Sequence, residues 1–201
     1  DGQFPLDLGT WPGLEAQIAA LSDDIAYDNH DVDDGLRAGL FALGDLLDVP
    51  LVARSWDAVR ARFPDVGQER LMPELVRHQI GLMANDLLVE TRRRIAASGV
   101  ETVEDVRHHP GALAGFSEEM AAEERVLKAF LYANMYKAPQ VETVRVEAQK
   151  VVAGLAAVYR ADPRLLPEPW RPADASPVAT LLAIGVFIAA WKWNLSPIDA
   201  I

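Results

Sequence analysis

The chain has no cysteine among its 201 residues. This absence excludes disulfides, thiolate metal ligands and cysteine nucleophiles. It fits a reducing compartment, so the expected location is the cytoplasm. Residues 1–13 have neither a basic start nor a continuous apolar run, so this end does not resemble a secretory signal. It reads like the middle of a loop, and we expect further residues upstream in the natural protein.

Basic residues are scarce. Lysine and arginine number 19 against 30 aspartates and glutamates, which gives a formal net charge of −11. A general nucleic-acid-binding surface is therefore not expected. A small anionic ligand would need a local positive centre, and a bound divalent cation is the usual one.

Sustained alternation of apolar and polar residues is also missing, which argues against strands. Long amphipathic stretches separated by short Pro, Gly and Asp clusters predict an all-α protein instead. Ser55 and Ser117 are read as helix caps, and Ser98-Gly99 as a helix end. The pattern predicts helices over residues 12–30, 32–47, 55–63, 68–97, 117–136 and 139–160, with a further turn or short helix from Thr102.

The segment 178–191 is apolar except for Thr180. It is too short to span a bilayer. We interpret it as a buried terminal helix or an oligomer contact, with a membrane-surface anchor as the alternative.

An unusual acidic segment lies between Leu21 and Asp34, with six aspartates, one histidine and one tyrosine. At helical spacing, Asp23, Tyr27 and Asp31 share one face. Carboxylates so arranged repel one another unless a cation or a hydrogen-bonding partner offsets the repulsion, and a cation is the simpler explanation. Three further aspartates are interpreted as a solvated face or as helix caps: Asp28, Asp33 and Asp34.

Residues 23–27 read DDIAY and residues 29–39 read NHDVDDGLRAG, a block that resembles the signature of the deoxyguanosinetriphosphate triphosphohydrolase-like (dGTPase-like) proteins of the HD-domain superfamily. Residues 116–120, 127–132 and 135–136 agree with the same family. The resemblance extends over roughly residues 1–170. It implies a helical HD-domain-like bundle, of which this chain would be the C-terminal part.

The resemblance also implies a chemistry. Family members bind one divalent metal, such as Mg²⁺, Mn²⁺ or Fe²⁺, and release tripolyphosphate from a deoxynucleoside triphosphate (dNTP). Asp23 matches a metal ligand of the family, while Tyr27 and Asp31 match substrate contacts; Lys128 and Tyr132 are further candidate substrate contacts. The family's remaining ligands, a histidine and a His-Asp pair, would precede this segment. The pair His30-Asp31 is not that doublet, so we expect the chain alone to be inactive.

This interpretation predicts three regions: 1–48 as the end of the HD-like domain, 49–170 as the family's helical C-terminal region, and 171–201 as a divergent apolar tail. The expected partners are a dNTP substrate, a nucleotide effector as a further candidate, and other copies of the chain in a homo-oligomer. The rival hypothesis is a noncatalytic remnant that binds nucleotide or serves assembly. The missing ligands favour it, as does a tail without the family's Tyr-Ile-Ala-Gly-Met-Thr-Asp-like stretch.

Weaker signals have simpler explanations. His108 and His109 precede a proline in a predicted loop, where exposure is the ordinary outcome, and His78 is compatible with a buried, hydrogen-bonded histidine. Residues 92–94 are three arginines near a predicted helix end, favoured there by the helix dipole, with phosphate or effector binding as the alternative. Tyr136 shares a predicted helical face with Lys128 and Tyr132, which core packing explains nearly as well as a nucleotide does.

Overall fold

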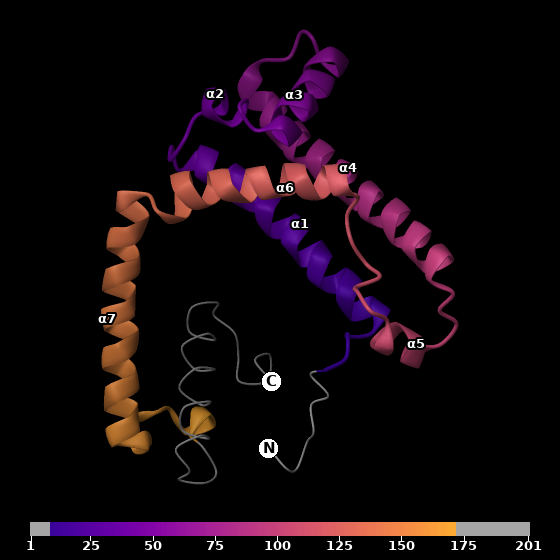
Figure 1. The fold of residues 1–201 in the computed structure, drawn as a ribbon. Helices are drawn as coiled ribbons and strands as arrows, with labels where there is room; N and C mark the ends of the chain where they lie inside the picture. Colours follow the sequence, from indigo (N-terminus) through magenta and orange to yellow (C-terminus); the bar gives the residue numbers. More distant parts are fainter. Residues whose placement is uncertain (1–8, 172–201) are drawn as a thin grey trace. The chain divides into compact units, whose positions relative to one another are not determined.

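The structure, a computed structural model, describes residues 9–171 and divides the chain after Ala138 into two compact units. All regular elements in residues 9–171 are helical (Figure 1). The predicted all-α class is therefore confirmed, and the helical arrangement is consistent with an HD-domain-like bundle. None of the helices in the described ranges is long and apolar enough to cross a membrane.

Helix α1 (Leu14–Arg37) carries the acidic segment without interruption. The predicted break between His30 and Val32 was wrong. No proline or glycine lies there, and Val32 is fully buried in the core, so packing continues the helix through this point. The chain leaves α1 only after Arg37 and turns at Gly39, whose φ of 66° suits glycine.

The helices that follow α1 also differ from the prediction. Only a short α2 (Leu43–Leu46) forms where the helix over 32–47 was expected to end, and α3 (Pro50–Arg62) begins well before the predicted cap. Pro50 suits the first helical position because its missing N–H needs no partner there. Ser55 lies inside α3, where its buried hydroxyl donates to the Leu51 carbonyl at 2.6 Å. The hydroxyl is thus satisfied within the helix rather than at its start.

The long helix α4 (Gln68–Ser98) ends as predicted, at Gly99 in the left-handed conformation with φ 71°. The last turn of α4 contains no basic residue. The arginines at 92–94 lie before it, so their expected interaction with the helix end was wrong.

Two helices complete the first unit. Helix α5 (Val103–His108) follows its cap Thr102, where a turn or short helix was predicted to start, and α6 (Glu118–Leu131) follows the predicted cap Ser117. The Ser117 Oγ accepts a hydrogen bond from the Met120 N–H at 3.2 Å. A π-helical turn, η1 (Tyr132–Tyr136), extends α6 to the predicted end.

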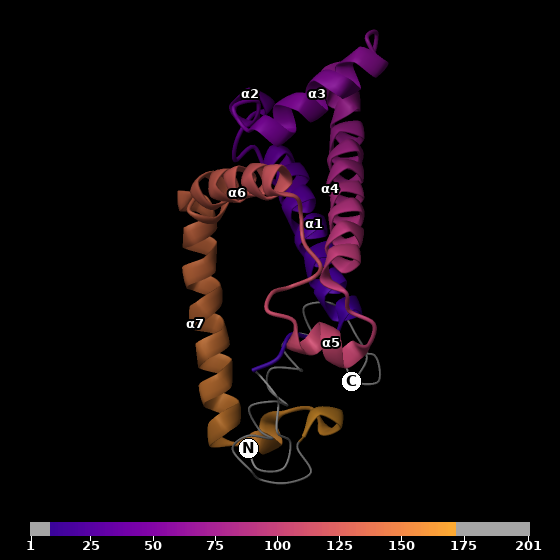
Figure 2. The same cartoon turned by 45° about the vertical axis from the view of Figure 1, so that its right-hand side comes forward.

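The core of the first unit lies where α1, α3, α4 and α6 meet (Figure 1, Figure 2). Helix α1 packs along α4, and α6 contacts both α1 and α3. This packing places the acidic segment of α1 opposite the second half of α6. The buried apolar residues of this core include Ile25, Val32, Phe41, Leu46, Leu51, Val52, Leu75, Met83, Leu87, Met120, Leu127 and Leu131.

The described part of the second unit consists of α7 (Pro139–Ala161) and two short 3-10 helices, η2 (Pro163–Leu165) and η3 (Glu168–Trp170). The predicted helix over 139–160 is confirmed. The predicted apolar helix over 178–191 lies outside the described residues.

Candidate functional site

The candidate site is the face where the acidic segment of α1 meets α6 and its π-helical extension. Asp24, Asp28 and Asp31 supply carboxylates from α1, while Lys128 and Tyr136 approach from the other side. The three aspartates lie at helical spacings of four and three residues, so they follow one side of α1. We call these five residues the acidic face.

Asp31 and Tyr136 are joined directly, since the Tyr136 hydroxyl donates a hydrogen bond to an Asp31 carboxylate oxygen. Partial burial of the phenol, followed by this contact, raises the pKa of Tyr136 above its ordinary value. The phenol therefore stays protonated at neutral pH and acts as a donor. This contact between residues far apart in the sequence fixes one end of the acidic face.

Lys128 is the cation of the acidic face. Its Nζ lies 2.5 Å from a Glu124 carboxylate oxygen and 3.3 Å from one of Asp24. Desolvation opposes its charge, but the carboxylates of Glu124, Asp28 and Asp24 prevail and raise the pKa of Lys128. The lysine thus remains charged. It supplies the local positive charge that an anionic ligand would need on so acidic a chain.

Asp28 is the residue that sequence reasoning misjudged, because it is buried (5% exposed) rather than solvated. Its Oδ2 has no hydrogen-bond partner among the described residues. Burial raises the pKa of Asp28 to about 7; Lys128 opposes this shift, whereas Glu124, Asp24 and Asp31 add to it. Asp28 therefore exchanges its proton near neutral pH, inside the acidic face.

Asn29 and Gln79 are further buried polar residues, from α1 and α4. The Asn29 amide donates to the Ile25 carbonyl at 2.8 Å and contacts the Met83 sulfur at 3.4 Å, while its Oδ1 is unpartnered among the described residues. The side-chain amide nitrogen and oxygen of Gln79 also have no hydrogen-bond partner among the described residues. The interior behind the acidic face is therefore polar as well as apolar.

The other predicted site residues are exposed. Asp23 is accessible on α1, Tyr27 is 63% exposed, and Tyr132 is 57% exposed. The Tyr132 ring instead lies 5.3 Å from the Lys137 ammonium. Of the predicted set, the structure thus places Asp31 and Lys128 on the acidic face, where Asp31 contacts Tyr136 and Lys128 contacts Asp24. It adds Asp28 and leaves Asp23, Tyr27 and Tyr132 open to solvent.

Asp23 was predicted to be a metal ligand. Its accessible carboxylate has the oxygen chemistry that divalent cations accept. Within residues 9–171, however, no three His, Asp or Glu side chains lie close enough to hold a metal ion. These residues therefore do not fit a complete metal site, and Asp23 would need ligands from outside them.

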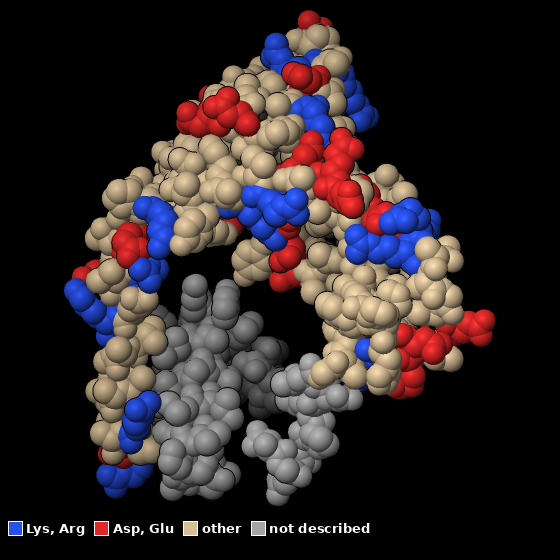
Figure 3. Space-filling model, viewed as in Figure 1, with Lys and Arg blue, Asp and Glu red and all other residues tan. Residues whose placement is uncertain are grey.

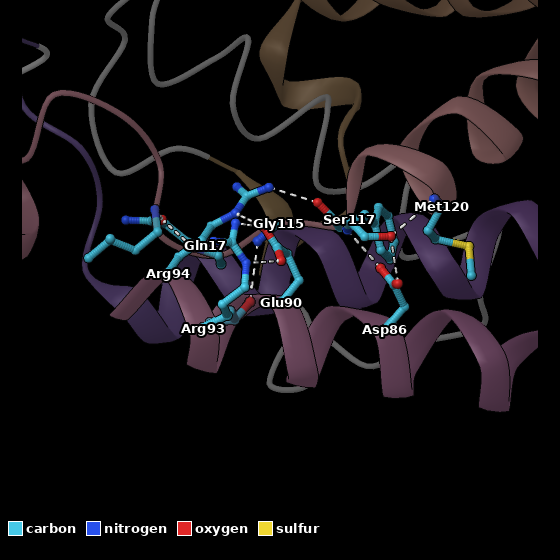
Figure 4. A network of polar contacts seen from close by, with 12 residues as sticks. Gln17, Asp86, Glu90, Arg93, Arg94, Gly115, Ser117 and Met120 are labelled. Atoms are coloured by element: carbon cyan, nitrogen blue, oxygen red, sulfur yellow. Dashed lines mark hydrogen bonds and ion pairs between the residues drawn. The ribbon is translucent and has the colours of Figure 1, made fainter. Parts of the chain in front are cut away.

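A polar network on α4 positions the start of α6 (Figure 4). The Asp86 carboxylate accepts hydrogen bonds from the Ser117 backbone N–H at 2.8 Å and from its hydroxyl at 2.7 Å. Nearby, Arg94 donates to the Phe116 carbonyl at 2.7 Å and to Glu90 at 2.8 Å. These contacts fix the point from which α6 runs across α1. They also give Arg94, one of the three consecutive arginines, a structural role.

The four histidines are exposed or half-buried. His108, predicted to lie in a loop, is instead the exposed last residue of α5. The Nδ1 of His109, just after that helix, lies 2.7 Å from the Gly111 carbonyl oxygen. His30 is exposed on α1, while His78 is half-buried on α4. The interpretation of His78 as a buried, hydrogen-bonded histidine is not met among the described residues.

We predict that Asp28→Asn stabilises the protein at pH 8 by about 2 kcal/mol and has little effect at pH 4. Between pH 4 and 7 the folded protein keeps a proton on Asp28 that the unfolded chain has lost, so wild-type stability falls as pH rises and levels off above pH 7. Asparagine has nearly the same shape and no charge to bury. Urea unfolding at both pH values measures the difference.

Asp34→Asn is the matched control, because Asp34 is exposed on the same helix. Its effect should stay within about 0.5 kcal/mol at either pH. An Asp28→Asn effect of equal size at both pH values would show that Asp28 does not titrate in the folded protein between them.

The chain is similar to known proteins over most of its length. A phosphohydrolase-associated domain model matches residues 114–189, a range that begins just before α6. The chain is 45% identical over 170 residues to a deoxyguanosinetriphosphate triphosphohydrolase-like protein of Caulobacter vibrioides, an alignment covering 85% of this chain and 43% of the relative. The same name is given to a Brucella suis protein that is 47% identical over 171 residues (85% of this chain, 42% of the relative).

A Rhodopseudomonas palustris protein of the same name is 46% identical over 177 residues, which cover 88% of this chain and 44% of the relative. The chain thus spans less than half the length of these curated relatives. Identity at this level over most of the chain, together with the phosphohydrolase-associated match, confirms the resemblance given by the signature block. The chain is a homologue of the deoxyguanosinetriphosphate triphosphohydrolase-like proteins over 85% of its length.

Proposed function

We propose that this chain is the C-terminal part of a metal-dependent phosphohydrolase that cleaves a dNTP, dGTP-like in class, to deoxynucleoside and tripolyphosphate. The observation that carries the proposal is that Lys128 contacts Asp24 and Tyr136 contacts Asp31 along one side of α1. The chain that holds them is a homologue of proteins named deoxyguanosinetriphosphate triphosphohydrolase-like. A carboxylate and a phenol suit the hydroxyls of a sugar, and an ammonium suits phosphate.

In this proposal Asp23 is one metal ligand, and the remaining ligands come from outside residues 9–171. Tyr27 and Tyr132 are accessible for substrate contact beside Asp31 and Lys128. The Asp31–Tyr136 hydrogen bond holds the carboxylate in place before a substrate arrives, which limits the entropy lost on binding. Lys128 already faces carboxylates, so a phosphate would compete with Glu124 and Asp24 for it.

The second candidate function is noncatalytic nucleotide binding or assembly. It is favoured by the lack, within residues 9–171, of any His, Asp and Glu trio able to hold a metal. In this case the acidic face would bind nucleotide without cleaving it, or would only join α1 to α6.

The genomic sequence upstream of Asp1, together with an activity assay, distinguishes the two. The enzyme proposal expects an in-frame extension encoding a histidine and a His-Asp pair, and release of tripolyphosphate from a dNTP by the extended protein in Mn²⁺ or Mg²⁺. A genuine start near Asp1, with nucleotide binding or self-association but no release, supports the second candidate.

A further inference from the structure

An open pocket lies between the end of α3 and the first half of α4, away from the acidic face. Its volume is about 320 Å³, and it is lined by two arginines, one histidine, one glutamate and several apolar residues. The charged and polar members are Arg62, Arg77, His78 and Glu74. None of them belongs to the site described above.

The charge of this pocket is opposite to that of the chain. Two arginines against one glutamate leave one excess positive charge in the lining, whereas the whole chain carries −11. Arg62 has no ion-pair partner among the described residues, and Arg77 is paired only with Glu74, one turn away on α4. In Figure 3 basic side chains gather over the α3–α4 end of the molecule, with acidic ones beside them. A small anion would meet at least one uncommitted guanidinium here.

The pocket also has an apolar part. Among its lining residues, Val59 is buried, while Phe63 and Leu82 are half-buried. The Arg62 guanidinium carbon lies 5.2 Å from the centre of the Phe63 ring, so the cation and the aromatic wall adjoin. At Gly81, another lining residue, a Cβ would meet nothing within 4 Å, so there is open space beside this part of α4.

The helix dipole explains only part of this arrangement. Basic residues in the last turn of α3, Arg60 and Arg62, are favoured by the negative end of the helix. Arg77 and His78 lie in the third turn of α4, where no helix end accounts for them. The dipole also does not account for a cavity with an aromatic wall between the two helices.

We propose that this pocket binds a small phosphate monoester with a planar or apolar organic part. The phosphate would lie between Arg62 and Arg77, displacing Glu74 from Arg77, and the organic part would lie against Phe63 and Leu82. Guanidinium groups suit phosphate because they donate parallel N–H bonds to its oxygens. The inference does not depend on the proposed hydrolysis, because its residues are not those of the acidic face.

Phenyl phosphate is the probe, titrated into the full chain at pH 7.5 by calorimetry and followed by NMR of the histidine ring signals. We expect saturable one-site binding that shifts the signals of His78 and leaves those of His30, His108 and His109 unchanged. Inorganic phosphate and phenol, each offering half of the chemistry, should each bind about tenfold more weakly or worse. Higher salt should weaken the binding of phenyl phosphate.

Arg62→Gln and Arg77→Gln should each weaken phenyl phosphate binding about tenfold, since each removes one charge-assisted contact. Arg60→Gln is the matched control: Arg60 lies in the same turn as Arg62 but faces the Trp56 ring, 5.9 Å away, and should change the affinity less than about twofold. All three arginines are exposed, so thermal unfolding should be unaffected. No saturable binding, no His78 shift, or equal affinity in the wild type and both pocket variants would overturn the proposal. Equal affinity for phosphate and phenyl phosphate would contradict the proposed contact of an organic group with Phe63 and Leu82.

Discussion

Gly35→Ala is expected to destabilise the first unit by about 2 kcal/mol, although alanine is the better helix former. Gly35 is buried in the last turns of α1, and a Cβ there would overlap the ring of Phe41. That ring cannot move freely, because it is buried and packs edge-on against Phe130 of α6 at 5.2 Å between centroids. The extra methyl group must therefore displace either α1 or the aromatic pair. Urea unfolding of both proteins measures the loss.

Gly81→Ala provides the matched control, since Gly81 lies inside α4 with open space around its Cβ position. The same substitution should stabilise the protein there, by about 0.5 to 1 kcal/mol. Phe41→Leu in the Gly35→Ala background should recover part of the loss, because it removes the overlapping ring. Equal effects at Gly35 and Gly81 would show that Phe41 does not limit the space beside α1.

Glu90→Gln should also cost about 2 kcal/mol at pH 7, less than a fully buried ion pair because Arg93 is largely exposed. Glu90 is nearly buried on α4 and accepts hydrogen bonds from Arg93 at 2.7 Å and from Arg94 at 2.8 Å. Arg94 in turn donates to the Phe116 carbonyl, and a Cβ at Gly115 would overlap its guanidinium. Loss of the carboxylate charge thus loosens the segment that leads into α6.

The pH dependence of this effect has a definite sign. The hydrogen bonds from Arg93 and Arg94 lower the pKa of Glu90 to about 2 from an ordinary 4.5. Glu90 therefore stabilises the folded protein fully above pH 4.5, and this contribution is lost as pH falls toward 2. Denaturant unfolding from pH 7 to 2.5 should show the gap between wild type and Glu90→Gln narrowing with acid. Glu74→Gln is the control: its exposed pair with Arg77 should contribute less than about 0.5 kcal/mol, and an equal cost in both variants would contradict the special role of Glu90.

Several helix boundaries could be predicted from residues that cap or end helices. Gly99 and Ser117 act locally, through backbone conformation and a side-chain cap, so the end of α4 and the start of α6 were readable from sequence. The continuity of α1 was not, because it depends on burying Val32 in the core and Gly35 against the Phe41 ring. A tertiary contact of this kind overrides what local propensity suggests.

In the acidic face, too, the local features could be predicted from sequence and the tertiary contacts could not. The shared side of Asp23, Tyr27 and Asp31 follows from helical spacing, whereas the Asp31–Tyr136 contact depends on how α6 crosses α1. The expected common face of Lys128, Tyr132 and Tyr136 is altered by the π-helical turn, whose wider winding rotates later residues relative to an α-helix. That turn leaves no clear mark in the sequence.

The burial of Asp28, by contrast, had a readable signal. Asp28 lies three residues after Ile25 and four before Val32, which places it on the apolar side of α1. Both neighbours are in the core, and Asp28 is buried between them. Its place within a run of aspartates concealed this position, since such runs are usually solvated.

The most direct test of the proposed enzyme is tripolyphosphate release from each dNTP, with Mn²⁺ or Mg²⁺, by the longer protein to which we propose this chain belongs. We predict release by the wild type, a loss of more than about 100-fold in Asp23→Ala, and near wild-type release in Asp34→Ala, an exposed carboxylate on the same helix. No release from any dNTP with either metal, or equal release by the two variants, would contradict the proposed enzyme.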